Sequence, residues 1–174
     1  MDKALGTVLM ITAAVVCVVL VLNAVFPAIS SSSGAMTSAS ARMSERIKSS
    51  IEIIHAAGEY DDSGTWQDTN SDTEFDVFVW VKNIGTETIK SVESCDVFIG
   101  GNDTLWAWIP HADYASGLYP QWDYTIPNGT VWKKATTLRI EVSYAAASRP
   151  SAGEEYDVKV LIPNGVSDEH YFSM

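Results

Sequence analysis

The feature that most constrains this chain is an apolar run near its amino terminus. From Ala4 to Ile29 no residue is charged, and alanine, valine, leucine, isoleucine and methionine dominate. About 20 such residues are enough for a helix to cross the hydrocarbon core of a bilayer. We therefore interpret residues 4–29 as a transmembrane helix. A cleaved secretory signal is the main alternative, but its apolar core is normally about 7 to 15 residues long.

The residues before this run resemble a processing signal only weakly. Lys3-Ala4-Leu5-Gly6 is a poor version of the basic residue and small residue that a prepilin-type leader needs. We expect the amino-terminal helix to be retained rather than trimmed.

Helical periodicity continues after the apolar run. Residues 30–58 carry apolar side chains three or four positions apart, which is the spacing of an amphipathic helix: Met36, Ala39, Met43, Ile47, Ile51 and Ile54. We predict one helix with a kink at Pro27 and a stalk over residues 30–58, ending at Gly58. A lone helix with such a stripe is marginally stable, so the stripe is predicted to pack on the helix of another copy. The alternative is that Ser30 to Ser33 form a flexible linker.

The remaining residues, 59–174, have the pattern of a β domain. Runs rich in β-branched and aromatic residues alternate with turn residues, and the predicted strands are 75–82, 88–91, 95–99, 105–109, 122–126, 138–144, 156–162 and 170–172. The fold class is therefore α+β: a long amino-terminal pilin-like helix followed by an immunoglobulin-like antiparallel β-sandwich, without the Cys, Trp, Cys pattern of antibody domains.

Charge is distributed unevenly along the chain. Residues 1–59 hold four basic and four acidic groups, so residues 60–174 carry the whole net charge of -11. Such a domain repels nucleic acid, because phosphate contacts need lysine and arginine. After the apolar run there are three basic residues, Arg42, Arg46 and Lys48, whereas only Lys3 precedes it. Taken alone, the excess of basic residues on cytoplasmic sides of membranes would place the carboxyl-terminal part in the cytoplasm. Long domains translocate largely regardless of such charges, and we predict that this domain lies outside the membrane.

Two stretches carry the resemblance to a known family. They are the anchor and spacer from Ala24-Val25-Phe26-Pro27 to Met43-Ser44-Glu45-Arg46-Ile47-Lys48, and the strand Val79-Trp80-Val81-Lys82-Asn83-Ile84-Gly85. In these the chain resembles the archaeal flagella-related protein G (FlaG) family, accessory proteins of the archaellum. The resemblance spans essentially the whole chain, although the middle of the sandwich matches only as a pattern.

That resemblance implies a function. It implies a single-pass protein of the archaeal cell membrane whose carboxyl-terminal domain lies in the pseudoperiplasm and whose helices self-assemble. It also implies partnership with the sister protein F, which contacts the S-layer, and a role as the stator against which the motor works. Contact with the S-layer or the motor platform by this chain itself is left open.

Aromatic residues are concentrated in one segment of the β domain that is poor in charge. Large aromatics of this kind serve either as anchors of an interface or as core residues, and both roles remain open for Trp106, Trp108, Tyr114, Tyr119 and Trp122.

Sequence motifs for catalysis are absent: there is no nucleophile elbow, phosphate-binding loop or paired-cysteine metal site. We expect a non-enzymatic protein without a cofactor. One acidic loop has oxygen ligands at alternate positions, as calcium loops do, but departs from the EF-hand pattern at its sixth and twelfth positions; its candidate ligands are Asp68, Asn70, Asp72 and Glu74. Two Asn-x-Thr triplets make Asn102 and Asn128 candidate glycosylation sites.

Three functions are therefore compared. A membrane-anchored stator is favoured. An archaellin-like or pilin-like filament subunit would be processed and would form assemblies of this chain alone. A membrane-anchored ligand-binding ectodomain would need a pocket of convergent polar groups.

Overall fold

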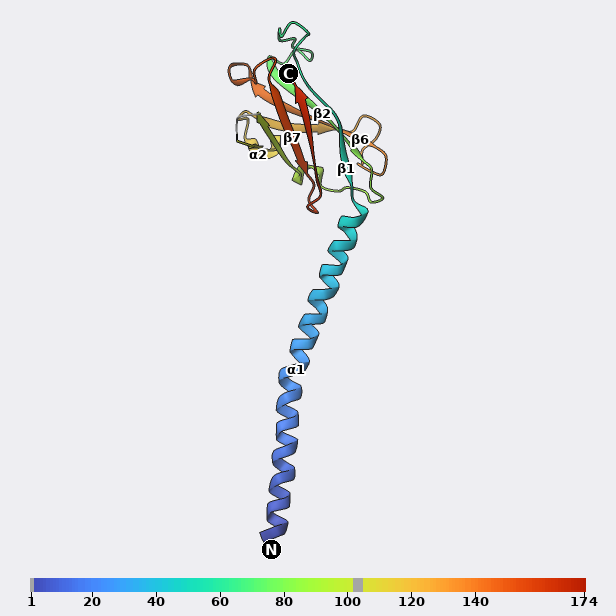
Figure 1. Ribbon diagram of the computed structural model, residues 1–174, viewed down its shortest axis with the longest axis vertical. Coiled ribbons are helices and arrows are strands. Elements are labelled where there is room, and N and C mark those ends of the chain that lie inside the picture. The colour runs from blue at the N-terminus through green and yellow to red at the C-terminus, as the bar shows by residue number, and fades with distance from the viewer. Residues whose placement is uncertain (1, 102–104) are drawn as a thin grey trace. The chain divides into compact units, whose positions relative to one another are not determined.

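The computed structural model describes residues 2–101 and 105–174. It divides into two compact units, Met1–Ser44 and Glu45–Met174. The first unit is helical, and the second contains the β domain together with the last turn of the helix. The long helix α1 runs from Asp2 to Lys48 without interruption (Figure 1).

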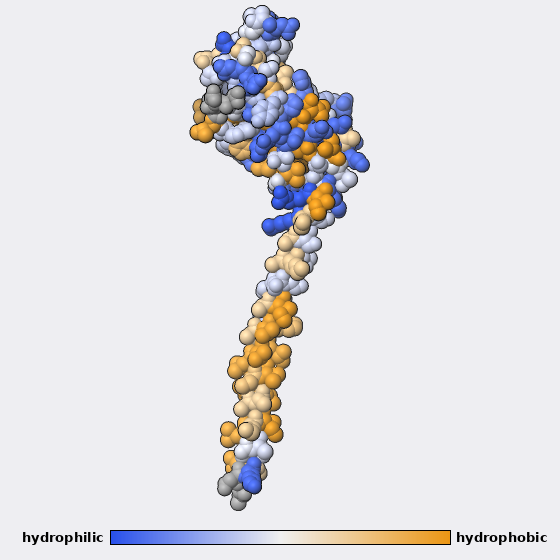
Figure 2. Space-filling view, in the orientation of Figure 1, coloured by the Kyte–Doolittle hydropathy of each residue, from blue (hydrophilic) through white to orange (hydrophobic). Residues whose placement is uncertain are grey.

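No part of the chain that the structure describes covers helix α1. Every side chain from Lys3 to Lys48 is exposed, and an 18-residue window of the helix has a mean hydropathy of 2.8. Figure 2 shows hydrophobic side chains over the amino-terminal half of the helix and paler, less hydrophobic ones beyond it. A helix that is apolar all round is stable only when lipid or other protein surrounds it.

The predicted continuity of the helix is confirmed, but its predicted end is wrong. The helix passes through Pro27 and the four serines, so Ser30 to Ser33 are not a linker. It ends at Lys48 rather than at Gly58, and residues 51–58 form strand β1. The stalk therefore covers residues 30–48. The kink at Pro27 stays a prediction.

Among the described residues, eight strands follow the helix and form two four-stranded antiparallel sheets with the orders β1-β2-β6-β5 and β4-β3-β7-β8. The strands and the short helix α2 have the bounds β1 Ile51–Gly58, β2 Glu74–Asn83, β3 Asp96–Gly101, β4 Ala107–Ile109, α2 Ala112–Ala115, β5 Gln121–Thr125, β6 Thr137–Ala145, β7 Glu155–Leu161 and β8 Ser167–Ser173. The predicted β-sandwich is confirmed. The predicted strand at 88–91 is wrong. Ile89 forms only an isolated bridge with Trp132, and a 3₁₀ turn follows at Val92–Ser94.

The core lies between the two sheets and consists of the inward side chains of alternate strand positions. On β2 these are Phe75, Val77, Val79 and Val81, all fully buried. They meet the inward residues of β6 and of the opposite sheet, among them Val97, Leu138, Ile140, Val142, Val158 and Val160.

Hydrogen bonds connect the edges of the two sheets. On one side the backbone N–H of Ile53 in β1 donates to the Asp168 carboxylate at the start of β8, at 2.7 Å. On the other side the N–H of Trp122 in β5 donates to the Pro110 carbonyl just after β4, at 3.0 Å. Edge strands with unpaired backbone groups invite pairing with other chains, and these bonds occupy part of both edges.

The end of α1 is fastened to the turn after β2. Lys48 C=O accepts the Thr86 N–H at 2.8 Å, and Ser50 C=O accepts the N–H groups of Ile84 and Gly85 at 3.0 and 2.9 Å. These bonds satisfy carbonyls that a helix end leaves without partners. Only glycine fits at position 85, because a Cβ there would lie 2.5 Å from the Lys48 carbonyl oxygen and 2.6 Å from the Ser50 nitrogen.

We predict that Gly85→Ala lowers the free energy of unfolding of the β domain by about 2 kcal/mol or more, because backbone atoms must move to admit the methyl group. Thermal unfolding of the full-length protein in detergent, followed by tryptophan fluorescence, measures this. Gly129→Ala is the matched control, since a Cβ at Gly129 meets nothing nearer than 3.9 Å. Equal stability of the two variants would contradict the prediction.

Candidate functional site

The predicted assembly stripe on the helix is shorter than expected. Met36, Met43 and Ile47 are exposed on α1, and Ala39 lies with them at helical spacing. The last two predicted members, Ile51 and Ile54, are in β1 instead, and Ile51 is buried in the core. The role of the remaining stripe in assembly stays a prediction.

The aromatic segment separates into one core residue and four surface residues. Trp122 is 1% exposed and packs in the sandwich core. The other four are exposed by 38 to 66%: Trp106, Trp108, Tyr114 and Tyr119. We call these four the exposed aromatic residues. Single exposed apolar side chains are normal on the surface of a soluble domain. Here the neighbouring Leu105 and Leu118 are exposed as well. The surface of this segment is therefore unusually apolar for an acidic domain.

Hydrogen bonds hold two of the exposed aromatic residues in place. Trp108, in the short edge strand β4, donates its indole N–H to Asp96 at 3.0 Å. The hydroxyl of Tyr119 donates to Glu74. Both contacts are with carboxylates, so the apolar surfaces of this segment lie beside negative charge. A partner that buried these aromatic side chains and placed basic groups beside the carboxylates would gain binding free energy from both contacts.

The loop between β1 and β2 is organised by Glu59, which is 4% exposed. One oxygen of its carboxylate accepts the N–H and the hydroxyl of Thr69. The other accepts the Trp66 indole N–H and the Asp76 backbone N–H, each at 3.2 Å. Four donors therefore converge on this buried carboxylate and occupy both of its oxygens, which fixes the loop against β2.

The predicted calcium ligands are only partly brought together. Asp68 accepts the N–H groups of Ser71 and Thr73, while Glu74 accepts the Tyr119 hydroxyl. Asn70 donates to Asp72 and to Asp76, both at 2.8 Å. Of the predicted set, Asp72 is the residue that belongs to a cluster of carboxylates, and its companions there were not predicted.

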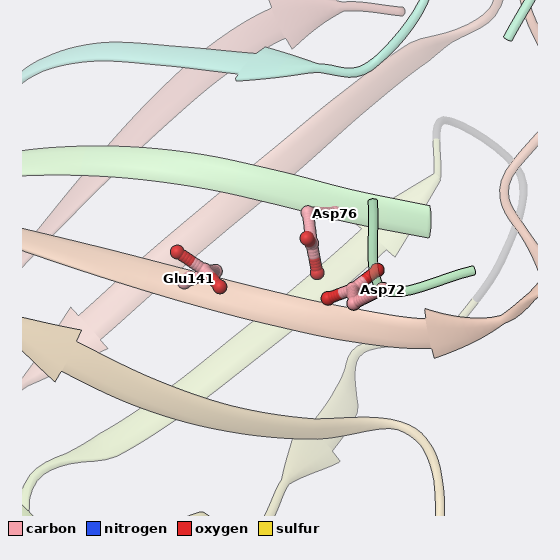
Figure 3. Close-up of side chains that lie close together, drawn as sticks. All are labelled: Asp72, Asp76 and Glu141. Carbon is pink, nitrogen blue, oxygen red and sulfur yellow. The ribbon is translucent and has the colours of Figure 1, made fainter. Parts of the chain in front are cut away.

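That cluster consists of Asp72, Asp76 and Glu141, whose carboxylate oxygens lie within 4.8 Å of one another. Asp76 is on β2, Glu141 is on β6, and Asp72 is in the loop that precedes β2. Figure 3 shows the Asp76 side chain between those of Glu141 and Asp72 (Figure 3). A carboxylate between two apolar residues of a strand, Phe75 and Val77, is the sequence signal that could have drawn attention to Asp76.

Burial and neighbouring negative charge raise the pKa values of two of these carboxyls, Asp76 and Glu141. The pKa of Asp76 rises from 3.8 to about 6, mainly through burial, with a contribution from the charges of Asp72, Glu141 and Glu59 and an opposing hydrogen-bonding effect of Ser143. Burial also raises the pKa of Glu141, although Arg139 opposes the change. Acidic groups are thus concentrated on the outer face of this sheet, where Arg139 offsets part of their charge.

The other candidate sites stay predictions. Asn128 is exposed in a turn after β5, where a glycan is sterically tolerable, while Asn102 lies outside the described residues. Cys95 is buried, and burial raises the pKa of its thiol to about 12, so it is an inert core residue.

The comparisons with known proteins agree with this architecture. The model of the archaeal-type flagellin family matches residues 4–172. The chain belongs to the archaeal-type flagellin family. Its relatives include an uncharacterized protein of Archaeoglobus fulgidus, 26% identical over 176 residues and 98% of each chain. The family is one of structural proteins, in agreement with the prediction that the chain is not an enzyme.

Two solved structures share its fold. The archaellum periplasmic stator protein FlaG from Sulfolobus acidocaldarius is 20% identical, with a TM-score of 0.52 over 71% of this chain and 99% of that one. The archaeal flagellum of Methanospirillum hungatei strain JF1 is 14% identical, with a TM-score of 0.58 over 99% of this chain and 92% of that one. At these identities both show the fold alone, and both accord with the predicted helix and sandwich.

We predict that Glu59→Gln destabilises the β domain by about 1.5 to 3 kcal/mol, because the neutral amide has one acceptor oxygen where four donors now converge. Urea unfolding of the full-length protein in detergent measures the change. Glu87→Gln serves as the control, since Glu87 is about half exposed and its contact with Lys48 is a surface ion pair at 3.5 Å. Equal midpoints for the two variants would show that Glu59 does not organise the loop.

The raised pKa of Asp76 predicts the pH dependence of stability in the presence of a chelator. Between pH 4 and 6 the folded protein binds a proton that the unfolded chain, with a pKa near 3.8, has already released. The contribution of Asp76 to the free energy of unfolding therefore falls as pH rises through that window, by about 1 to 3 kcal/mol.

Unfolding measured from pH 4 to 6.5 tests this, with Asp76→Asn expected to flatten the decline. Asp62→Asn, a change of the same charge at an exposed position of the same loop, is expected to leave it unaltered. A wild-type profile that rises over this range, or one that Asp76→Asn leaves as steep, would contradict the prediction.

Proposed function

We propose that this protein is a membrane-anchored, stationary accessory subunit of the archaellum. In this proposal the apolar part of α1 crosses the cell membrane once, and the β domain lies in the pseudoperiplasm as part of the stator. The observation that carries the proposal is the uncovered helix, which is uncharged from Ala4 to Ala41 and exposed at every position. Such a helix needs lipid or neighbouring helices around it.

The stator role draws support from the β domain. It shares its fold with 99% of the solved chain of the FlaG stator protein, which is also known in complex with FlaF. A stationary part of a rotary machine must be held at two places, the membrane and the cell envelope. A helix with an envelope domain provides both attachments, and we propose that a FlaF-like sister protein is the partner on the envelope side.

A filament subunit is the second candidate. It is favoured by the similarity to the archaeal flagellum of Methanospirillum hungatei, which extends over 99% of this chain and includes α1. In that role the helices would form the core of a filament rather than an anchor in the membrane.

The decisive experiment is cell fractionation with an intact-mass determination of the amino terminus of the native protein. The stator proposal predicts an unprocessed terminus and a protein that remains in washed membranes after shearing. A terminus trimmed near Ala4, with the protein recovered in sheared filaments, would reject the stator in favour of the filament subunit.

Cysteine crosslinking tests whether the helix stripe joins copies. With Cys17 replaced by serine, Met43→Cys is expected to give disulfide-linked dimers in membranes. Ala41→Cys is the matched control, because a residue two positions away lies on nearly the opposite side of the helix. Equal crosslinking at both positions would contradict packing through the stripe.

Binding of the partner tests the exposed aromatic residues. We expect Trp108→Ala to weaken copurification of the FlaF-like partner by roughly tenfold or more, because exposed tryptophans that become buried dominate interface energies. Tyr171→Ala is the control, since Tyr171 is 75% exposed on β8, at the other edge of the same sheet. Equal losses for the two variants would contradict a binding site at Trp108.

A further inference from the structure

His111 lies between β4 and β5, in the segment that carries the exposed aromatic residues. Its side chain is 6% exposed and packs edge-on against Trp122, with the two ring centroids 4.6 Å apart. Backbone contacts hold it there, because His111 forms a bridge with Trp122 and the Trp122 N–H donates to the Pro110 carbonyl at 3.0 Å. Histidine is the side chain that most readily changes its charge between pH 5 and 8. Buried beside a candidate binding surface, it can alter the charge of that surface.

The two ring nitrogens of His111 have different surroundings. Nδ1 accepts the backbone N–H of Asp113 at 3.2 Å, which makes His111 the N-cap of α2. A nitrogen that accepts a hydrogen bond carries no proton, so in the neutral ring the proton is assigned to Nε2. Nε2 is buried and has no hydrogen-bond partner among the described residues. A buried donor without an acceptor costs free energy, and pairing it would remove that cost.

Two carboxylates lie just beyond hydrogen-bond distance of the ring. The Asp113 carboxylate is 3.6 Å from Nδ1, and the Asp123 carboxylate on β5 is 3.8 Å from Nε2. Their side chains are 78% and 73% exposed, so they can turn toward the ring or toward a partner. A protonated imidazole would draw both into charge-assisted hydrogen bonds and would pair Nε2 at the same time.

The other titratable groups of the neighbouring elements carry no positive charge: Tyr114, Tyr124, Glu93, Cys95 and Asp96. The rings of Tyr114 and Tyr124 lie 6.1 and 6.0 Å from the His111 ring. The pKa of Tyr124 is raised, mainly by burial and then by the negative groups around it, among them Glu93 and both aspartates. The surroundings of His111 are therefore acidic, and the charge of its own ring is what offsets them.

Carboxylates also lie beside the exposed aromatic residues. The Trp108 indole N–H donates to Asp96. The Tyr119 hydroxyl donates to Glu74. Among the described residues, no lysine or arginine forms an ion pair with these two carboxylates or with the two that flank His111. A partner that complements this surface has basic groups around an apolar centre.

We propose that His111 makes the binding of a basic partner at the exposed aromatic residues dependent on pH. While the ring is neutral, Asp113 and Asp123 are free to pair with basic groups of the partner. Once the ring is protonated, both carboxylates turn to the imidazolium, whose charge offsets theirs, and binding weakens. This role of His111 rests on the proposed partner site at Trp108 and adds the charge of the partner and the pH at which it binds.

Loss of the helix cap acts in the same direction. A protonated Nδ1 cannot accept the Asp113 N–H, so α2 loses its N-cap. Helix α2 has four residues and includes Tyr114, and Leu118 and Tyr119 follow it as exposed side chains. Without the cap this segment is less ordered, and a partner that binds it must order it again at a cost in conformational entropy.

The first test measures binding of the purified FlaF-like partner to the full-length protein in detergent at pH 7.5 and pH 5.5. We expect the wild type to bind roughly tenfold more weakly at pH 5.5. His111→Asn keeps a capping acceptor but has no charge at either pH, so it should bind about equally at both. His55→Asn is the matched control, because His55 is exposed on β1, at the opposite edge of the sheet from β5. It should keep the wild-type dependence.

The comparison of wild type with His111→Asn is essential, because Asp76, with a pKa of about 6, titrates in the same range. If His111→Asn does not fold, the double variant Asp113→Asn, Asp123→Asn replaces it. Both positions are exposed. The double variant should bind more weakly than wild type at pH 7.5 and should show no further loss at pH 5.5.

NMR of the full-length protein in detergent tests His111 without the partner. In the wild type the amide proton signal of Asp113 is expected to move upfield between pH 7.5 and pH 5.5, because its hydrogen bond to Nδ1 is lost. In His111→Asn the signal should stay in place. An Asp113 signal that does not respond to pH in the wild type overturns the role of His111.

The binding outcomes separate this role from the partner site itself. No binding of the FlaF-like partner at either pH rejects the partner site and the role of His111 with it. Equal binding by the wild type at both pH values rejects the role of His111 alone, as does a loss at pH 5.5 that His111→Asn shares in full.

Discussion

The rest of the structure depends on the backbone contact between the end of α1 and the turn after β2. The carbonyl of Lys48 would be left without a partner at the helix end, and the Thr86 N–H provides one at 2.8 Å. Gly85 permits this approach because it has no Cβ. With Ser49 and Ser50 held there, β1 begins at Ile51 and pairs Ile51 with Asn83. That pairing places Ile51 and Ile53 in the core.

Helix and β domain place different demands on their surroundings. The β domain buries its apolar side chains internally and keeps its acidic residues on the surface. Helix α1 buries none of its own, so its stability depends on lipid or on other helices. The exposed stripe at Met36, Met43 and Ile47 continues beyond the apolar run. The same helix can therefore interact with a membrane along one part and with helices of other copies along the next.

Sequence patterns predicted the elements that depend on local interactions. They did not predict features that depend on pairing between segments far apart in the chain. The long helix and most strands followed from periodicity. The segment from Ile51 to Ile54 fits both a helical stripe and a strand, and its pairing with β2 is what selects the strand. The carboxylate cluster was missed for the same reason. Asp76 and Glu141 are 65 positions apart in the sequence, and only the register of β2 with β6 makes them neighbours.

The hydrogen bonds at the sandwich edges favour one mode of partner binding over another. Addition of a strand from a partner requires unpaired backbone groups at an edge. In β1 the Ile53 N–H is already bound by Asp168, and in β5 the Trp122 N–H is bound by Pro110. β4, in turn, has only three residues, too few for an extended ladder. Side-chain recognition through Trp106, Trp108, Tyr114 and Tyr119 is therefore the more favourable route to a specific partner, because these side chains are exposed while the nearby backbone is occupied.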